Sequence, residues 1–175
     1  QEEVFVYTDE TGYRAQAFAQ GISFRLIMFG KGTEHIPELR IDCEGECDES
    51  ISDAYLYEQD DNGLHRVTRA ASRDENGFMF RSEDVKSLLA LKGGIPRFYT
   101  LVYDVGNRAV DGSLFSFAIR KSGVKTTYAK EIVGPFPVQG PMQVVYQVDD
   151  LADVVAQNVT PAGRAEISAG VDTVL

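Results

Sequence analysis

Residues 96–121 read PRFYTLVYDVGNRAVDGSLFSFAIRK and contain two strand patterns with turn-forming residues between them. In the first pattern, over residues 98–105, both alternating sets of side chains are largely apolar. Successive side chains point to opposite faces of a strand, so two apolar faces are typical of a strand that is buried on both sides. We therefore expect this segment to be a central strand of a sheet.

The second pattern alternates more cleanly than the first. Phe115, Phe117 and Ile119 point one way, and Ser116 and Arg120 point the other. This alternation predicts a strand with one face in the core and one face near solvent. The loop between the two patterns, GNRAVDG, supplies residues that form close turns. The whole stretch therefore predicts a β-hairpin.

Part of this stretch resembles a known family. Its residues Tyr99-Thr100-Leu101, Tyr103-Asp104 and Gly106-Asn107 are similar to the penultimate strand and exit turn of bacterial immunoglobulin-like and fibronectin-like modules, where the pattern Y-T-L-x-V-x-D-x-x-G-N is common. The chain departs from that pattern by placing a single residue between Asp104 and Gly106. The resemblance implies an immunoglobulin-like β-sandwich, and the pattern carries no catalytic residue that could be transferred.

The clearest helix pattern lies just before this stretch. Ser82 is placed to cap a helix over residues 82–93, Glu83 and Asp84 suit its positive end, and Lys92 suits its other end. An isolated immunoglobulin-like module has about 100 residues, so this chain of 175 residues has more than one such module needs. We expect an all-β fold: an antiparallel immunoglobulin-like β-sandwich with one short crossover helix in residues 1–121, and a C-terminal extension, residues 122–175, packed on the same domain.

Other local patterns add to this expectation. Residues 53–69 predict a second hairpin with the turn sequence DDNG, and Gly21 predicts a bulge or bend within a long strand. In the extension we expect strands over residues 125–133 and 142–148 and a short helix over residues 150–157.

Composition excludes some partners. The formal net charge is -10, and the 17 Lys and Arg residues form no basic stripe, whereas nucleic acid binding requires one. Anionic membrane surfaces are disfavoured for the same reason. The chain has no run of 18 apolar residues, so we expect no membrane insertion. Because the chain begins with Gln1, we expect that an upstream piece, such as a signal peptide, has been removed.

Cys43 and Cys47 are the only cysteines, and they flank a glycine in an acidic loop. We expect them to form a local disulfide, which favours a secreted or periplasmic protein. Two alternatives stay open. They are a pair of free thiols and a metal site, although neither His35 nor His65 has a metal-ligand spacing to the cysteines.

Calcium is the metal that acidic loops favour, but we expect no cofactor. Residues 58–69 match part of an EF-hand loop, and the match fails at its last position, which carries Arg69 in place of a bidentate glutamate. A looser calcium site in the loop after Cys43 remains an alternative. Its ligands would come from Glu46, Asp48, Glu49 and Asp53.

The last residues form another alternating pattern. Ala165, Ile167, Ala169 and Val171 share one face. This pattern predicts either an edge strand of the same domain or a strand that docks on a neighbouring molecule by β-augmentation.

No catalytic motif is recognisable, and neither cysteine lies in a setting that would make it reactive. The sequence therefore favours a non-catalytic exported module for protein binding or assembly at the cell surface or in the periplasm, with a protein partner or a second copy of the chain. The alternatives are a glycan-binding module, with or without calcium, and a small hydrolase that uses paired carboxylates.

Overall fold

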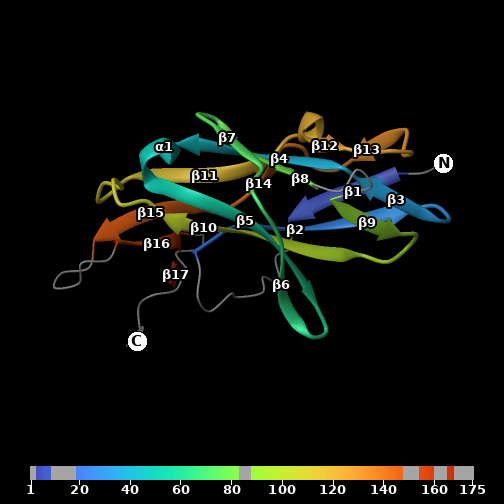
Figure 1. Cartoon of the computed structure of the whole chain (residues 1–175), viewed down its shortest axis with the longest axis horizontal. Coiled ribbons are helices and arrows are strands. Elements are labelled where there is room, and N and C mark those ends of the chain that lie inside the picture. Colours follow the sequence, from blue (N-terminus) through green and yellow to red (C-terminus); the bar gives the residue numbers. More distant parts are fainter. Residues whose placement is uncertain (1–2, 9–18, 83–87, 148–153, 160–164, 168–175) are drawn as a thin grey trace.

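A computed structural model of the chain describes residues 3–8, 19–82, 88–147, 154–159 and 165–167. The fold is all-β, and its strands are antiparallel except for one parallel pair, β1 with β13. Two large sheets enclose one hydrophobic core, in a β-sandwich-like arrangement (Figure 1).

The first large sheet has six strands. In spatial order they are β13 (Glu131–Val133), β1 (Glu3–Thr8), β2 (Ala19–Phe29), β10 (Arg97–Val105), β5 (Ile51–Asp60) and β6 (Gly63–Arg69). β10 lies between β2 and β5, and its run from Tyr99 to Tyr103 is buried. The prediction of a central strand is thus confirmed.

The second large sheet has nine strands. Its main path is β17 (Ala165–Ile167), β16 (Val154–Val159), β15 (Met142–Gln147), β11 (Leu114–Ile119), β4 (Glu38–Gly45), β8 (Gly77–Arg81) and β7 (Ser72–Asp74). Two short strands join it from the side: β12 (Val124–Lys125) pairs with β4, and β14 (Val138–Gln139) pairs with β11. Strands after residue 121 therefore take part in both large sheets.

The hairpin predicted for residues 96–121 is wrong, because its two strands belong to different sheets. Both edges of β10 are taken by β2 and β5, and β11 pairs with β4 and β15 instead. The connection, residues 106–113, is long enough to cross between packed layers, which lie about 10 Å apart. The two sheets contact each other here, since the ring of Tyr103 in β10 packs against the rings of Phe115 and Phe117 in β11.

Both predicted helices are corrected. Leu89–Lys92, the second half of the helix expected over residues 82–93, is strand β9, which pairs with β3 (Thr33–Ile36) in a small third sheet. Residues 83–87 lie outside the described part of the chain. The helix expected over residues 150–157 is replaced from Val154 by β16, while its first residues are also outside the described part. In both cases strand pairing overrides local helix propensity: β9 pairs with the distant β3, and β16 pairs with its sequence neighbours β15 and β17.

The helices of the described residues are short. They are α1 (Cys47–Ser50) and a 3-10 turn, Lys121–Gly123. Among the described residues, no helix combines the length and hydropathy that a bilayer crossing needs.

Several local predictions are confirmed. Residues 53–69 form the β5–β6 hairpin, with Asp60 opposite Gly63 at its turn. Gly21 lies at a bulge, because the register of β2 against β10 shifts there. A side chain at Gly21 would overlap the Phe117 ring of the facing sheet, so the bulge also permits close packing. One local prediction is corrected: the strand expected over residues 125–133 is divided into β12 and β13, because residues 126–130 between them form a loop.

A buried carboxylate holds that loop in place. The side chain of Glu34 in β3 is fully buried and accepts hydrogen bonds from the backbone N–H groups of Thr127 at 2.7 Å, Tyr128 at 3.0 Å and Ala129. The N–H of His35 also donates to it, at 2.9 Å. These donors compensate for the cost of burying the carboxylate.

Candidate functional site

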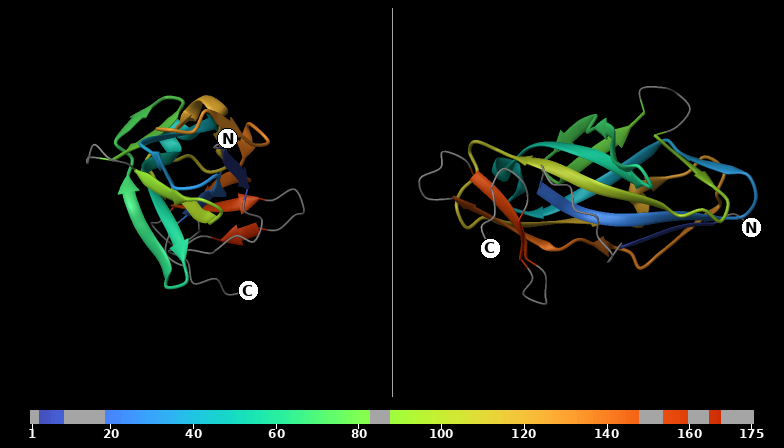
Figure 2. Two further views of the ribbon diagram at one scale, coloured as in Figure 1. Left: turned by 90° about the vertical axis from the view of Figure 1, so that its right-hand side faces the viewer. Right: turned by 90° about the horizontal axis from the view of Figure 1, so that it is seen from below.

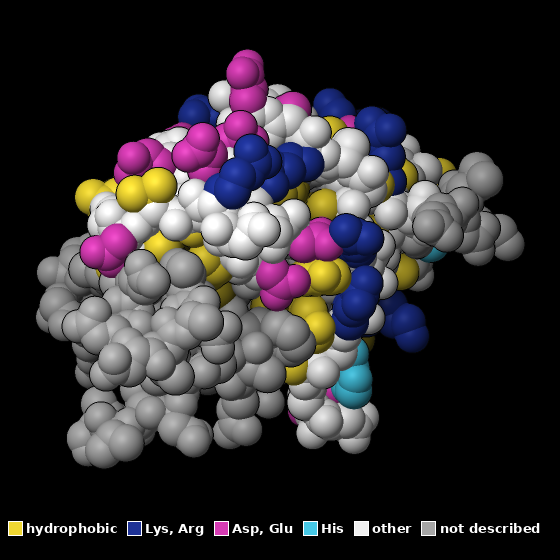
Figure 3. All heavy atoms as spheres, turned by 60° about the vertical axis from the view of Figure 1, so that its left-hand side comes forward, with side chains coloured by type: hydrophobic (Ala, Val, Ile, Leu, Met, Phe, Trp, Pro, Cys, Tyr) yellow, Lys and Arg dark blue, Asp and Glu magenta, His cyan; other side chains and the backbone are white. Residues whose placement is uncertain are grey.

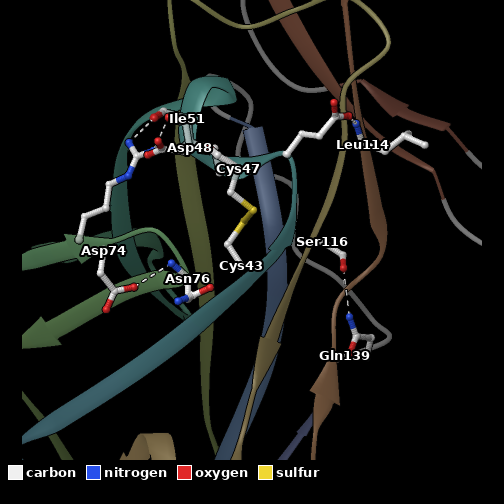
Figure 4. The surroundings of a disulfide bond; sticks show 11 residues. Cys43, Cys47, Asp48, Ile51, Asp74, Asn76, Leu114, Ser116 and Gln139 are labelled. Carbon is white, nitrogen blue, oxygen red and sulfur yellow. Dashed lines mark hydrogen bonds and ion pairs between the residues drawn. A yellow bond between two sulfur atoms is a disulfide. The ribbon is translucent and has the colours of Figure 1, made fainter.

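The two cysteines form a disulfide near the C-terminal end of β4, within the nine-stranded sheet (Figure 4). Cys43 lies in β4 and Cys47 begins α1, and both are buried. Gly45 allows the tight connection between them, because it has a φ of +98° and lies against the backbone of Leu114. The predicted disulfide is present in this structure, in place of the free thiols or the metal site that were its alternatives.

Arg73 binds the turn that the disulfide closes. Its guanidinium donates to the carbonyl oxygens of Ile51 and, at 3.3 Å, of Cys47, and to Asp48 Oδ1 at 3.1 Å. The guanidinium also lies over the Phe78 ring, 5.5 Å from its centroid. Its hydrogen bonds to backbone carbonyls show that this arginine positions α1 and the start of β5.

A pocket of about 350 Å³ lies beside Arg73. It lies where the chain passes from one sheet to the other, since the N–H of Ala70 bonds to Ala54 in β5 and the N–H of Ala71 bonds to Met79 in β8. Besides these two alanines, its walls are Ser52, Asp53, Arg69, Ser72, Arg73 and Phe78. The pocket is therefore at the C-terminal end of β6.

β6 itself is an open edge of the six-stranded sheet. It is seven residues long and pairs with β5 on one side, and no described residue pairs with its other side. The end of the β5–β6 hairpin projects from the body of the molecule (Figures 1 and 2). An unpaired row of backbone N–H and C=O groups is a template for a further strand.

The exposed side chains along β6 are basic. His65, Arg66 and Arg69 are exposed, and the strand has no acidic residue. Lys and Arg side chains gather on the side of the molecule from which the hairpin projects (Figure 3). This local charge differs from the net charge of -10 of the whole chain.

A set of polar contacts joins β6 to the outer face of β5. The guanidinium of Arg66 lies 4.6 Å from the centroid of the Tyr55 ring, and Arg69 forms an ion pair with Asp53. Tyr55 donates a hydrogen bond of 3.2 Å to Asp53. Burial and the nearby charges of Asp104 and Asp53 raise the pKa of Tyr55, so its hydroxyl stays protonated and remains a donor.

Asp53 is held as an anion by these contacts. Partial burial opposes its ionisation, but the hydrogen bonds from Arg69 and from the backbone N–H of Ala54 outweigh burial and hold the pKa of Asp53 below its usual value. Asp53 therefore stays ionised and accepts hydrogen bonds from Arg69 and Ala54, so it does not serve as a proton donor.

Several described charges elsewhere are also paired. Along the outside of β4, Arg40 forms a bidentate pair with Asp74 at 2.8 Å and a further bond to Asp42. Arg120 bridges Asp42 and Glu44, each at 3.0 Å. Hydrogen bonds from Arg40 and from backbone N–H groups lower the pKa of Asp74 to about 2.

The acidic residues proposed as calcium ligands do not converge. Glu46 accepts a hydrogen bond from the N–H of Leu114 at 2.9 Å, while Asp48 pairs with Arg73 and Asp53 with Arg69. No group of three or more His, Cys, Asp or Glu side chains in the described residues is placed to hold a metal ion.

The predicted docking strand is described only in part. Ala165–Ile167 form β17, which pairs with β16 of the same chain and lies at the end of the nine-stranded sheet. Ala169 and Val171 lie outside the described residues.

The sequence did not predict the open edge of β6 or the pocket beside it. The basic sequence GLHRVTR can be read from the chain, but whether it lies at a sheet edge depends on which strands pair.

No protein-family model matches the sequence, and the curated proteins give no significant match. The proposals that follow therefore rest on the geometry of the molecule.

Proposed function

We propose that this chain is a non-catalytic protein-binding module of immunoglobulin-like type, exported to the cell surface or the periplasm, which binds an extended segment of another chain along β6. The observation that carries this proposal is the open edge of β6, seven residues long. In β-augmentation the main-chain hydrogen bonds supply affinity and the pockets for side chains supply specificity. β6 has an unpaired main-chain edge, and a pocket adjoins it, since Arg69 belongs both to β6 and to the wall of the pocket.

The proposed location is supported by the disulfide between Cys43 and Cys47. Disulfides form and persist in oxidising compartments and are rare in the cytosol. The antiparallel two-sheet fold and the strand pattern at residues 99–107 support the immunoglobulin-like assignment.

The alternatives find less support in the described residues. A glycan platform uses open aromatic faces, and Arg66 covers one face of the Tyr55 ring. A hydrolase with paired carboxylates needs a proton donor with a raised pKa. The described carboxyl groups with a shifted pKa, Asp53, Asp60 and Asp74, all have a lowered one.

Selection from a random peptide library displayed on phage, followed by amide hydrogen exchange with the selected peptides, tests the proposal. We expect peptides that slow the exchange of β6 amides, because a new strand pairs with its open side. Peptides that protect only other strands would contradict β6 as the binding edge. Failure to select any peptide that protects a sheet edge would contradict strand addition altogether.

A further inference from the structure

We propose that the segment bound by β6 is acidic, and that Arg66 selects it. This inference rests on the proposed function, because it names the chemistry of the partner at the same edge. It begins from the sequence of β6, GLHRVTR, which carries three basic side chains and no acidic one. An added strand would place its side chains beside His65, Arg66 and Arg69.

Arg66 differs from the other arginines of this region. Arg69 is paired with Asp53, Arg73 with Asp48 and Arg97 with Glu58. Among the described residues, no carboxylate pairs with Arg66, whose guanidinium stacks on Tyr55 and is exposed. Its N–H donors are therefore available to a carboxylate of the partner.

The stacking on Tyr55 also prepares Arg66 for binding. A guanidinium that lies over an aromatic ring keeps its edge free for hydrogen bonds in the plane of the group. Because the side chain is already held at 4.6 Å from the ring centroid, it loses less conformational freedom when a carboxylate binds.

The same charges disfavour a second copy of this chain as the partner. In an antiparallel pair of β6 strands centred on Arg66, the two Arg66 side chains would lie opposite each other. Like charges directly opposite each other destabilise a strand pair. The charge of Arg66 therefore disfavours a second copy of this chain and favours an acidic strand. Both effects contribute to specificity for the partner.

Other sheet edges fit a partner strand less well. β7, β13 and β17 are also end strands, and each has three residues. In β7 the two charged residues, Arg73 and Asp74, are already paired within the molecule. β6 is therefore the longest described edge, and its Arg66, unlike Arg73 in β7, has no carboxylate partner among the described residues.

The test uses four synthetic peptides of about eight residues, close to the length of β6. The first alternates glutamate with valine. The second has glutamine in place of glutamate, the third has lysine, and the fourth repeats the acidic sequence with alternate backbone nitrogens methylated. Binding to the whole chain is measured by fluorescence anisotropy at low and at physiological salt, and hydrogen exchange locates the site.

We expect the acidic peptide to bind more tightly than the glutamine peptide, with an advantage that shrinks at higher salt, and to protect β6 amides. The lysine peptide should bind most weakly. Arg66→Gln should weaken the acidic peptide about two- to fivefold and leave the glutamine peptide unchanged. The matched control is Lys31→Gln, which removes one positive charge from the exposed turn before β3 and should have no effect.

Three results would overturn the inference. Equal affinity for the acidic and glutamine peptides, together with protection of β6, would leave strand addition intact but remove the selection for acid. Equal loss with Arg66→Gln and Lys31→Gln would show a general charge effect in place of a role for Arg66. Binding of the methylated acidic peptide as tightly as its parent would show attraction of a polyanion without strand pairing, and would count against the proposed function as well.

Discussion

Tyr103 Oη donates a hydrogen bond of 2.6 Å to Gln143 Oε1 within the core, and so links β10 of one sheet to β15 of the other. Both side chains are almost completely inaccessible to solvent. Burial raises the pKa of Tyr103 well above its usual value, so the hydroxyl keeps its proton. Gln143 in turn donates to the carbonyl of Pro141 at 3.1 Å. This pair is a polar connection between the two sheets within the hydrophobic core.

Tyr103→Phe should lower the free energy of unfolding by about 1–3 kcal/mol, because it leaves Gln143 Oε1 buried without a donor. Urea denaturation measures the change. The matched control is Tyr128→Phe, at an exposed position, which should change stability by less than about 0.5 kcal/mol. A loss at Tyr103 no greater than that of the control would show that the hydrogen bond does not contribute to stability.

Glu34→Gln should lower the free energy of unfolding by about 2–3 kcal/mol, because an amide replaces a charged acceptor that serves several backbone donors. The same change should speed hydrogen exchange at Thr127, Tyr128 and Ala129. Glu131→Gln, at an exposed position in β13, is the control and should leave these amides as slow as before. Unchanged exchange in Glu34→Gln would mean that the loop is held by other contacts.

Replacing Cys43 and Cys47 together by alanine should lower the free energy of unfolding by about 2 kcal/mol, the chain-entropy value for so short a loop. The reduced wild-type protein should show a similar loss, while the double variant should not respond to a reductant. Thermal unfolding with and without reductant makes both comparisons. A variant as stable as the oxidised protein would mean that the rest of the site, including Arg73, holds the turn unaided.

The ion pair of Asp74 with Arg40 should make a small contribution to stability that depends on pH. Because hydrogen bonds from Arg40 and the backbone lower the pKa of Asp74 to about 2 from a usual value near 4, the contribution is complete above that usual value and disappears as pH falls through about 2. Since Asp74 is exposed, we expect less than about 1 kcal/mol. The difference in unfolding free energy between wild type and Asp74→Asn should therefore be largest near neutral pH and vanish in acid. A difference that stays constant over this range would exclude the ion pair as its cause.

Local patterns in the sequence identify many strands but not their partners. The two apolar faces of residues 98–105 correctly indicate a central strand, and the turn sequence DDNG correctly indicates the β5–β6 hairpin, because both signals are local. The partners of β10 come from residues 19–29 and 51–60. No local signal in residues 96–121 could show that these distant strands occupy both edges of β10 and send β11 to the other sheet.

The same limit applies to the helix and to the site. LALK at residues 89–92 fits a helix or a strand, and pairing with β3 decides for the strand. At the site, the single pair of cysteines around a glycine led to the prediction of the disulfide, with free thiols and a metal site as alternatives. The pocket was beyond prediction, because its walls come from β5, β6, β7 and β8, which meet only in the folded chain.

The parallel pair of β1 with β13 has a consequence for how the chain reaches its fold. Residues Glu3 to Phe5 lie beside Glu131 to Val133, so during synthesis β1 lacks one neighbour until β13, far along the sequence, has been made. Contacts so distant in sequence slow folding. Until then the open edge of β1 can pair with another chain, so aggregation is a risk during this interval and a chaperone would reduce it.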